Sequence, residues 1–438
     1  MGALLRRLDL RGTPLGALAS RLPRPEAESG SAREELRAAV SGIIAEVRSR
    51  GDEALVDLGR RFDGVSPPSL RVPASEIAEA LASIGGPLKD ALGLAYERVM
   101  AYHAHRKPAL GSAFSGGGVR VSELVIPVER AGLYAPGGRA SYPSTVLMCA
   151  APAQVAGVSE LALCVPPGPD GRVAEVSLAA AAIAGIEEVY CTGGAQAVAA
   201  MAFGTETIRS VDVIVGPGNR YVAEAKSQVA GQVGVPSAYA GPSEVVVVAD
   251  ESAEVSLAAV DVMVQAEHGP DGLAWLVTCS DAVADGVDAE MERLIGLSGR
   301  RAELEATLAS GGYSVLVDDL EAAITVANLV APEHLELMTE DPEALVPMVR
   351  NAGAVFLGSS TPATLGDYVA GPNHVLPTAR TARFASALRV DDFCRHVHVV
   401  SSLPGEIGPL LDAVEEIALA EGLDMHGRSA SMRRAGLP

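Results

Sequence analysis

The sequence predicts an α/β protein with two Rossmann-like, doubly wound domains that contain parallel sheets, together with a small N-terminal arm and a C-terminal helical tail. From about residue 130, apolar runs of strand length alternate with helical segments, and this repeated β-α-β order is typical of parallel sheets. A second series of the same kind begins near residue 253. The chain has 438 residues, more than one typical hydrophobic core contains, so two domains are the simplest arrangement.

The part of the chain before the first β/α series is predicted to be mostly helical. Residues 1–30 carry several Pro, Gly and Ser residues and are expected to form an arm. Apolar residues then recur at helical spacing and predict an amphipathic helix: Leu36, Val40, Ile43, Ile44 and Val47. Gly51 ends this helix, and Asp52 caps the next one. A further helical stretch is expected over 75–104, and residues 110–120 are expected to be a flexible connector.

The first β/α series contains five predicted strands, at Ala131–Ala135, Leu161–Val165, Glu188–Thr192, Val211–Val215 and Val245–Ala249. Helices are expected between them, at 144–156, 173–184, 195–203 and 219–230. Glycine-rich loops begin at Tyr134, Thr192 and Gly216, and ligands of such sheets bind beyond the carboxyl ends of the strands. No loop has the G-x-G-x-x-G spacing, because Tyr221 occupies the third glycine position after Gly216. A nucleotide cofactor is therefore indicated by the topology alone.

The second series predicts strands at Ala274–Thr278, Ser314–Val317, Leu335–Met338 and Ala354–Leu357, with helices at 253–268, 281–309, 320–330 and 341–351. The tail is expected to be helical over 408–420 and is too small for a core of its own. We therefore divide the chain into an arm (1–30), a first Rossmann-like domain (31–129 and 241–379), a second one (130–240) and a tail domain (380–438).

The composition argues against several classes of function. The chain has 34 Lys and Arg against 55 Asp and Glu, a net charge of -21, which disfavours binding to nucleic acid or to an anionic membrane. The N-terminal residues lack an apolar stretch of signal-peptide length, and no apolar run is long enough to cross a bilayer. The five cysteines are scattered and odd in number, as in proteins with reduced thiols. We expect a cytoplasmic protein that binds neither nucleic acid nor a membrane.

Short segments of the second half offer metal ligands and proton carriers: Gln265–His268, Glu333–His334, Asp367, Asn373–His374 and His426. His, Asp and a side-chain amide together suit zinc or manganese. Gln265 and His268 stand three residues apart on a predicted helix, so they share a face. Glu333 and His334 follow the helix-ending Pro332 on a helix-to-strand turn and can carry protons near neutral pH. Each segment alone also fits ordinary hydrogen-bonded or solvated side chains. The prediction of one active site therefore depends on the occurrence of all these segments together.

The other four histidines are not expected at a site. His103 and His105 lie in a charged helical stretch and are predicted to be surface residues. His396 and His398 alternate with valines, which predicts one face of a strand.

Many blocks of the sequence resemble the histidinol dehydrogenase family. The resemblance runs over nearly the whole chain, from Arg50–Leu55 and Phe62–Gly64 to the tail. Its most specific blocks are Glu129–Arg139, Ser144–Met148, Gly193–Gly204, Val215–Asn219, Ala240–Val245, Gln265–Asp271, Ala331–Leu335 and Gly371–Thr378. The chain departs from the family pattern at Ala379-Arg380, where a glycine pair is expected in many members, and around Gly111–Gly118.

The resemblance implies a role for each candidate residue. Zinc would be held by Gln265, His268, Asp367 and His426, and the last would come from the partner subunit of a homodimer, whose tail domain contributes to the site. Glu333 and His334 would be catalytic. The substrate contacts would be Ser243, Gln265, His268, His334, Asp367, His374, Glu421 and His426. The NAD contacts would be Tyr134, Gln196 and Asn219, which lie on the three glycine-rich loops.

The implied reaction is the oxidation of L-histidinol through L-histidinaldehyde to L-histidine, with one NAD reduced in each step. His334 would be the base and Glu333 would activate water, while zinc would anchor the imidazole and amino groups of the substrate. One alternative is a related zinc- and NAD-dependent dehydrogenase of another small hydroxy compound. A second is a thiol mechanism, with Cys149 as its nucleophile. A third is a non-catalytic nucleotide-binding protein that kept the fold.

Overall fold

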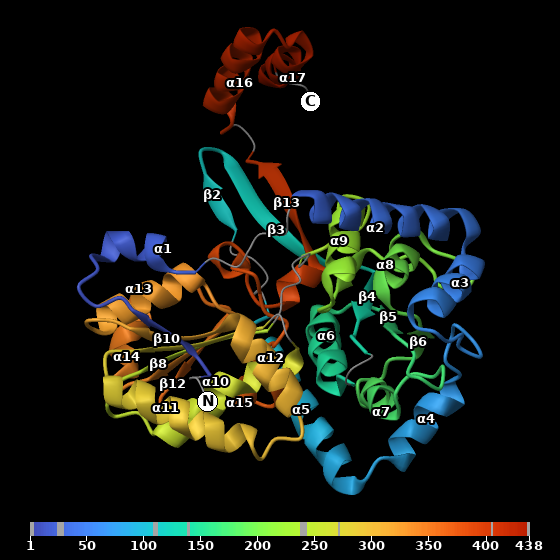
Figure 1. Cartoon of the computed structure of the whole chain (residues 1–438). Coiled ribbons are helices and arrows are strands. Elements are labelled where there is room, and N and C mark those ends of the chain that lie inside the picture. The colour runs from blue at the N-terminus through green and yellow to red at the C-terminus, as the bar shows by residue number, and fades with distance from the viewer. Residues whose placement is uncertain are drawn as a thin grey trace.

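The computed structural model describes residues 4–23, 30–107, 113–137, 141–236, 243–269, 272–403 and 406–435. Two α/β lobes lie side by side, and a narrow arm with two helices at its end projects from them (Figure 1). Each lobe contains one parallel sheet, which confirms the predicted fold class. No helix among these residues is long and apolar enough to cross a membrane.

The first lobe is built on a six-stranded parallel sheet with the order β1-β10-β9-β8-β11-β12. Its strands are β1 (Arg6–Asp9), β8 (Glu244–Ala249), β9 (Leu273–Thr278), β10 (Gly312–Leu316), β11 (His334–Met338) and β12 (Ala354–Leu357). One face packs against α10 (Val255–Val264), α11 (Asp281–Ile295) and α12 (Arg301–Gly311). The other face packs against α1 (Leu18–Arg21), α13 (Leu320–Val330) and α14 (Pro342–Leu345), and α15 (Ala363–Tyr368) follows β12.

The predicted N-terminal arm contains an edge strand of this sheet. Residues 6–9 pair in parallel with β10, and Leu5 is buried in the core beneath them. The sequence did not predict β1, because its Arg-Arg-Leu-Asp residues lack the apolar run of the other strands.

The second lobe is built on a four-stranded parallel sheet with the order β6-β5-β4-β7. Its strands are β4 (Arg130–Tyr134), β5 (Glu160–Val165), β6 (Glu188–Cys191) and β7 (Val213–Val215). One face packs against α4 (Ala74–Ser83), α5 (Gly86–His105), α6 (Pro143–Ala156) and α7 (Glu175–Ile183). The other face packs against α2 (Gly30–Arg50), α3 (Asp52–Phe62), α8 (Gly194–Phe203) and α9 (Arg220–Val229).

The helices between residues 30 and 105 belong with this four-stranded sheet. The sequence assigned residues 31–129 to the other domain, and the structure corrects that boundary. The predicted apolar stripe is real, because Val40 and Val47 of α2 are buried. The stripe packs in the same core as α8 and α9, and a helical stripe does not by itself reveal which sheet it will cover.

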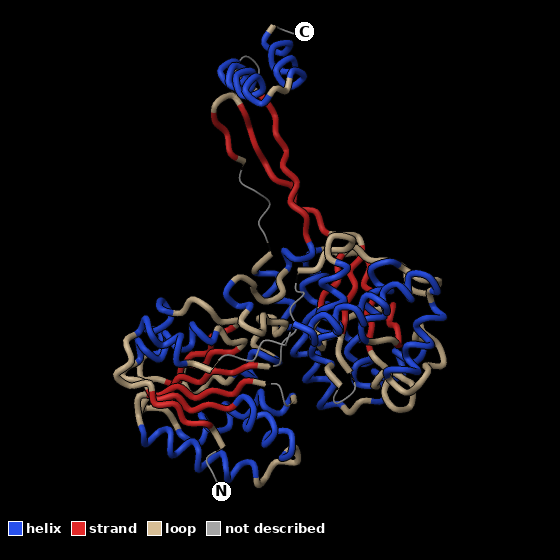
Figure 2. The backbone as a smooth tube through the Cα atoms, turned by 45° about the horizontal axis from the view of Figure 1, so that its top comes forward, coloured by secondary structure: helices blue, strands red, loops and turns tan. Residues whose placement is uncertain are grey.

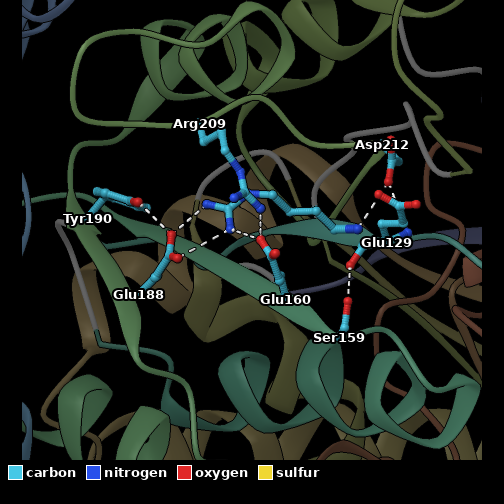
Figure 3. Close-up of polar contacts among 8 residues, drawn as sticks. Glu129, Ser159, Glu160, Glu188, Tyr190, Arg209 and Asp212 are labelled. Atoms are coloured by element: carbon cyan, nitrogen blue, oxygen red, sulfur yellow. Dashed lines mark hydrogen bonds and ion pairs between the residues drawn. The ribbon is translucent and has the colours of Figure 1, made fainter.

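The amino ends of the four strands carry a charged network (Figure 3). The Arg130 side chain is only 4% exposed and pairs with Glu160 at 2.8 Å and with Glu188 at 2.5 Å. The Tyr190 hydroxyl donates to Glu188 over 2.7 Å, and Arg209 also pairs with Glu160. The opposite, carboxyl ends of the strands carry the glycine-rich loops, so the two edges of this sheet have different chemistry.

The projecting arm is an antiparallel sheet of β2 (Phe114–Gly116), β3 (Val119–Pro127) and β13 (Cys394–Ser402). It ends in α16 (Gly408–Glu421) and α17 (Asp424–Arg434), which pack on each other away from the lobes (Figure 2). The predicted strand at His396 and His398 and the predicted tail helix are confirmed. The flexible connector predicted over 110–120 is wrong for its described part, because β2 and the start of β3 lie there; residues 108–112 lie outside the described part of the chain.

Candidate active site

Several of the predicted site residues converge at the amino edge of the six-stranded sheet. Glu333 and His334 stand at the start of β11, and the neighbouring β8 begins at Glu244. Helix α10 runs back from the far end of β8, so Gln265, which follows it, returns to the same edge. Asp367 reaches this edge from α15. Residues as far apart in the sequence as Glu244 and Asp367 therefore lie close together, because neighbouring parallel strands begin at the same edge of the sheet.

Asp367 links two of these side chains. Its carboxylate contacts His334 Nε2 over 2.9 Å and accepts a hydrogen bond of 3.2 Å from the Gln265 amide. Burial disfavours the charged forms of His334 and Asp367, but the attraction between their opposite charges outweighs this effect. The carboxylates of Glu333 and Asp367 raise the pKa of His334 to about 9, and the pKa of Asp367 stays below its ordinary value. In this arrangement His334 is an imidazolium.

Glu333 is a buried carboxyl whose proton is available near neutral pH. Its Oε2 accepts the backbone N–H of Glu244 at 3.1 Å and lies 3.7 Å from His334 Nδ1. Burial, opposed by the charge of His334, raises the pKa of Glu333 to about 7. A group that is half ionised near pH 7 can accept and return a proton, which suits a general base.

Glu244 is a second buried acid that the sequence analysis did not single out. Burial and the neighbouring Glu333 raise its pKa to about 8. Its Oε1 accepts the Ala379 N–H at 3.0 Å, whereas its Oε2 has no hydrogen-bond partner within the described residues. Its backbone carbonyl accepts a 3.2 Å hydrogen bond from His334 Nδ1, which fixes the orientation of the imidazole. The residue lies at the start of an apolar strand, and only its position before Val245–Ala249 could have indicated it.

A further acid pair lies beneath His334. Glu336 follows two residues later on the same face of β11, and its Oε1 accepts the Ala363 N–H at 2.8 Å. Burial and the adjacent Asp261 raise the pKa of Glu336 to about 8, and burial also raises the pKa of Asp261. These two carboxyls were not predicted either.

His374 connects this edge to the second lobe. Its Nδ1–H donates to the Asp367 carbonyl at 2.7 Å, so its Nε2 can accept from the Thr145 hydroxyl at 3.3 Å. The Asn373 amide donates to the Met148 carbonyl at 2.6 Å. Thr145 and Met148 belong to α6, which starts after the carboxyl end of β4. The amino edge of one sheet thus faces the carboxyl edge of the other.

His103 is not a surface residue, which corrects the prediction. It lies four residues after Val99 on the buried face of α5, is 1% exposed, and has its Nε2 3.4 Å from the Asn373 amide. Burial lowers its pKa to about 4, so it is neutral. The charged residues after it masked a helical spacing that could have shown its burial.

The three glycine-rich loops lie together at the carboxyl ends of the four-stranded sheet. The buried Tyr134 hydroxyl accepts the Gly194 N–H at 3.1 Å, and Gln196 is buried in the first turn of α8. Asn219 caps α9 by accepting from two backbone N–H groups, at 3.0 and 3.1 Å. Gly216 has φ +107°, and a Cβ there would lie 2.0 Å from the Tyr134 carbonyl. That close approach requires glycine.

Not every predicted residue is brought to the site within one chain. Ser243 is half-buried directly before β8, while the side chain of His268 lies outside the described part of the structure. Glu421 and His426 are exposed on the two tail helices, away from both lobes (Figure 1). Gln265 and Asp367 supply an amide and a carboxylate in contact, a donor set that fits a borderline-hard divalent cation. No group of three or more His, Cys, Asp or Glu residues poised for a metal occurs within the described ranges.

Comparison with known proteins gives consistent matches over the full length. The histidinol dehydrogenase family matches residues 26–434. The histidinol dehydrogenase of Synechococcus sp. is 47% identical over 402 residues, covering 91% of this chain and 92% of that protein. The histidinol dehydrogenase of Aromatoleum aromaticum is 45% identical over 436 residues, covering 98% of both. The crystal structure of histidinol dehydrogenase from Elizabethkingia anophelis matches with a TM-score of 0.92 and 32% identity, covering 99% of both chains.

Proposed function

The chain belongs to the histidinol dehydrogenase family of oxidoreductases, and from this premise we propose that it oxidises L-histidinol through L-histidinaldehyde to L-histidine. We propose NAD as the hydride acceptor of both steps and zinc as the metal. The observation that carries the proposal is the buried cluster of Glu333, His334, Asp367 and Gln265, which faces the lobe with the glycine-rich loops.

His334 would be the base of the first step. The alcohol oxygen would give its proton to Nε2, and bound NAD would supply the acceptor for the hydride that leaves the carbinol carbon. Nδ1–H stays on the Glu244 carbonyl, so Nε2 is the nitrogen that exchanges protons. The base must first be neutral, so the ion pair with Asp367 has to be broken before reaction.

Glu333 would act in the second step. Its carboxylate would take a proton from the water that adds to the aldehyde. His334, after releasing the proton of the first step, would take a proton from the hydrate, and a second bound NAD would supply the hydride acceptor. A pKa of about 7 leaves enough carboxylate at neutral pH for this role.

Gln265 and Asp367 would hold zinc together with His268 and with His426 of a second subunit. The ion, when bound, anchors and orients the imidazole and amino groups of the substrate. Engagement of Asp367 in a metal site would also remove its interaction with His334, which would lower the pKa of His334 toward the neutral form that a base requires.

We propose that a second copy of the chain completes the site. The tail helices stand away from the lobes and expose large apolar residues, among them Ile417, Leu419 and Met425. An exposed apolar surface of this kind is typical of an interface. His334→Gln and His426→Ala should each be inactive alone, and coexpression should restore part of the activity, because one site of the mixed dimer is then intact. Coexpressed activity no higher than that of either variant would contradict the shared site.

The thiol alternative is disfavoured by the position of Cys149. The residue is 1% exposed within α6, and burial raises its pKa to about 12. A nucleophilic thiol needs the thiolate form near neutral pH and access to the substrate. The buried, unpaired thiols fit a reducing compartment, which supports our proposal of a cytoplasmic enzyme.

The decisive experiment measures NADH formed per L-histidinol consumed by the zinc-loaded protein. We expect a ratio of about 2, from the two hydride transfers of the proposed reaction, with activity lost on chelation and restored by zinc. His334→Gln should abolish turnover, whereas the matched change of the exposed His105→Gln should not. No turnover by folded, zinc-loaded protein would point instead to another small hydroxy compound as the substrate.

A further inference from the structure

A cavity of about 470 Å³ opens on the first lobe, on the face of the six-stranded sheet that α1 and α13 cover. Its apolar wall includes Leu22, Leu273 and Leu329. Two arginines, Arg6 and Arg380, also line it, and none of its described lining residues is acidic. In a chain with a net charge of -21, a cavity with two cations and no acid is selective for anions.

The Arg6 guanidinium donates to the Ser310 carbonyl at the edge of this cavity, and two other donors of its wall lack partners. Arg380 Nε and Trp275 Nε1 are buried without a hydrogen-bond partner among the described residues. The Trp275 ring is 3% exposed and lies against Tyr313, with 4.8 Å between ring centroids. The Arg6 guanidinium covers the same tyrosine at 4.2 Å. Buried donors are normally satisfied, so an acceptor-rich ligand would complement this wall.

The backbone that presents Arg380 is strained. Ala379 and Arg380 have φ of 53° and 63°, and together with Ala331 they are the only non-glycine residues with positive φ in the described part of the chain. A Cβ disfavours this region, and strain of this kind is retained where it positions a functional group. The Ala379 N–H also donates to the buried Glu244 carboxyl, which ties the turn to the site edge.

From these observations we infer that the cavity is an accessory binding site for a small anion with a short apolar body, a carboxylate or a phosphate ester. Arg380 and Arg6 take the anionic group, and the leucine wall takes the apolar part. The volume lies in the range of pockets for small organic ligands, about 300–1,000 Å³.

Trp275 is the only tryptophan of the chain, so its fluorescence reports directly on this cavity. The full-length protein is titrated with hexanoate and with hexyl phosphate, and with hexanol as the uncharged probe of the same length. We expect saturable fluorescence changes with at least one of the two anions, and an affinity at least about tenfold weaker for hexanol, because charge-assisted hydrogen bonds are lost. The relative affinities of the two anions identify the preferred head group.

Two variants distinguish the contribution of the Arg380 guanidinium to anion binding from the effect of its strained backbone on stability. Arg380→Gln and Arg380→Gly should each weaken anion binding by about tenfold or more, and Arg380→Gly should keep or raise the melting temperature, because glycine tolerates the left-handed backbone. Arg293→Gln, an exposed arginine on α11 at the opposite face of the sheet, is the matched control and should bind normally. The inference is overturned if neither anion binds, if hexanol binds equally well, or if Arg380→Gln binds as the parent does. Neither L-histidinol nor NAD is present, so the result is independent of the proposed reaction.

Discussion

Replacing Glu333 with Gln should stabilise the protein while it removes activity. Burial raises the pKa of this carboxyl from 4.5 to about 7, so ionising it inside the fold is unfavourable. At 1.36 kcal/mol per pKa unit, the penalty reaches about 3 kcal/mol once both the folded and the unfolded forms are ionised. The amide keeps the shape of the side chain and an oxygen that can accept the Glu244 N–H, so the penalty disappears with little other change.

The sign of the pH dependence follows from the raised pKa. Below pH 4.5 the Glu333 carboxyl is neutral in both the folded and the unfolded state, so it does not lower the free energy of unfolding. The variant and the parent should therefore be equally stable there. The parent should lose stability as the pH rises from 4.5 through about 7. Above that pH the difference in stability between the variant and the parent should stay constant. At pH 8 the melting temperature of Glu333→Gln should be higher by several degrees, at about 2 °C per kcal/mol for a lobe of this size.

Thermal unfolding at pH 4.5 and pH 8, followed by oxidation assays with L-histidinaldehyde, tests both halves of this prediction. Loss of a general base costs about 10²–10⁴ in rate, so aldehyde oxidation should fall by that factor. Glu187→Gln, at an exposed position, is the matched control and should change stability by less than about 0.5 kcal/mol at either pH. A variant less stable than the parent at pH 8 would show that the ionised Glu333 contributes favourably, and the argument from burial would fail.

Three further changes give separate outcomes. Arg130→Met should lower the free energy of unfolding, measured by urea denaturation, by about 2–3 kcal/mol (Figure 3). The loss is smaller than for a fully buried ion pair, because Glu188 is partly solvated. Lys226→Met should raise the KM for NAD about tenfold with kcat preserved, because its buried ammonium donates to the Gly216 carbonyl and holds that loop; an unchanged KM in steady-state assays would contradict this role. Cys149→Ala should keep full kcat in NADH assays, and loss of turnover in a folded variant would revive the thiol mechanism.

The β/α order was predictable because buried parallel strands are short apolar runs. All of the strands predicted for the two lobes are present, with ends that differ by at most two residues. Two of the missed strands lack this signal, and the third, β3, was missed although it contains the apolar run Leu124-Val-Ile. β1 is a polar edge strand, and β2 is a three-residue strand in a glycine-rich segment. Pairing of β3 with β13 joins residues far apart in the chain, which local spacing does not reveal.

The candidate site was predictable where polar residues interrupt apolar elements. Glu333, His334 and Asp367 stand out at turns, and the structure places them in one cluster. Glu244 was missed because its role arises from register: β8 pairs with β11 so that His334 is opposite Val245. That pairing brings Glu244 beside Glu333, 89 residues later in the chain.

The concentration of acids around His334 explains why this edge of the sheet is energetically costly. Glu244, Glu333 and Glu336 each have a pKa raised to about 7 or 8, so each resists ionisation at the pH where the others begin to ionise. The positive charge of His334 favours the ionised form of all three, and His334 is held by Asp367. A packed apolar edge would be more stable, because each buried acid needs hydrogen bonds or a partner charge to remain in place. The edge instead holds several protons that exchange near neutral pH, a property that the two successive oxidations of the proposed reaction, each releasing a proton, would use.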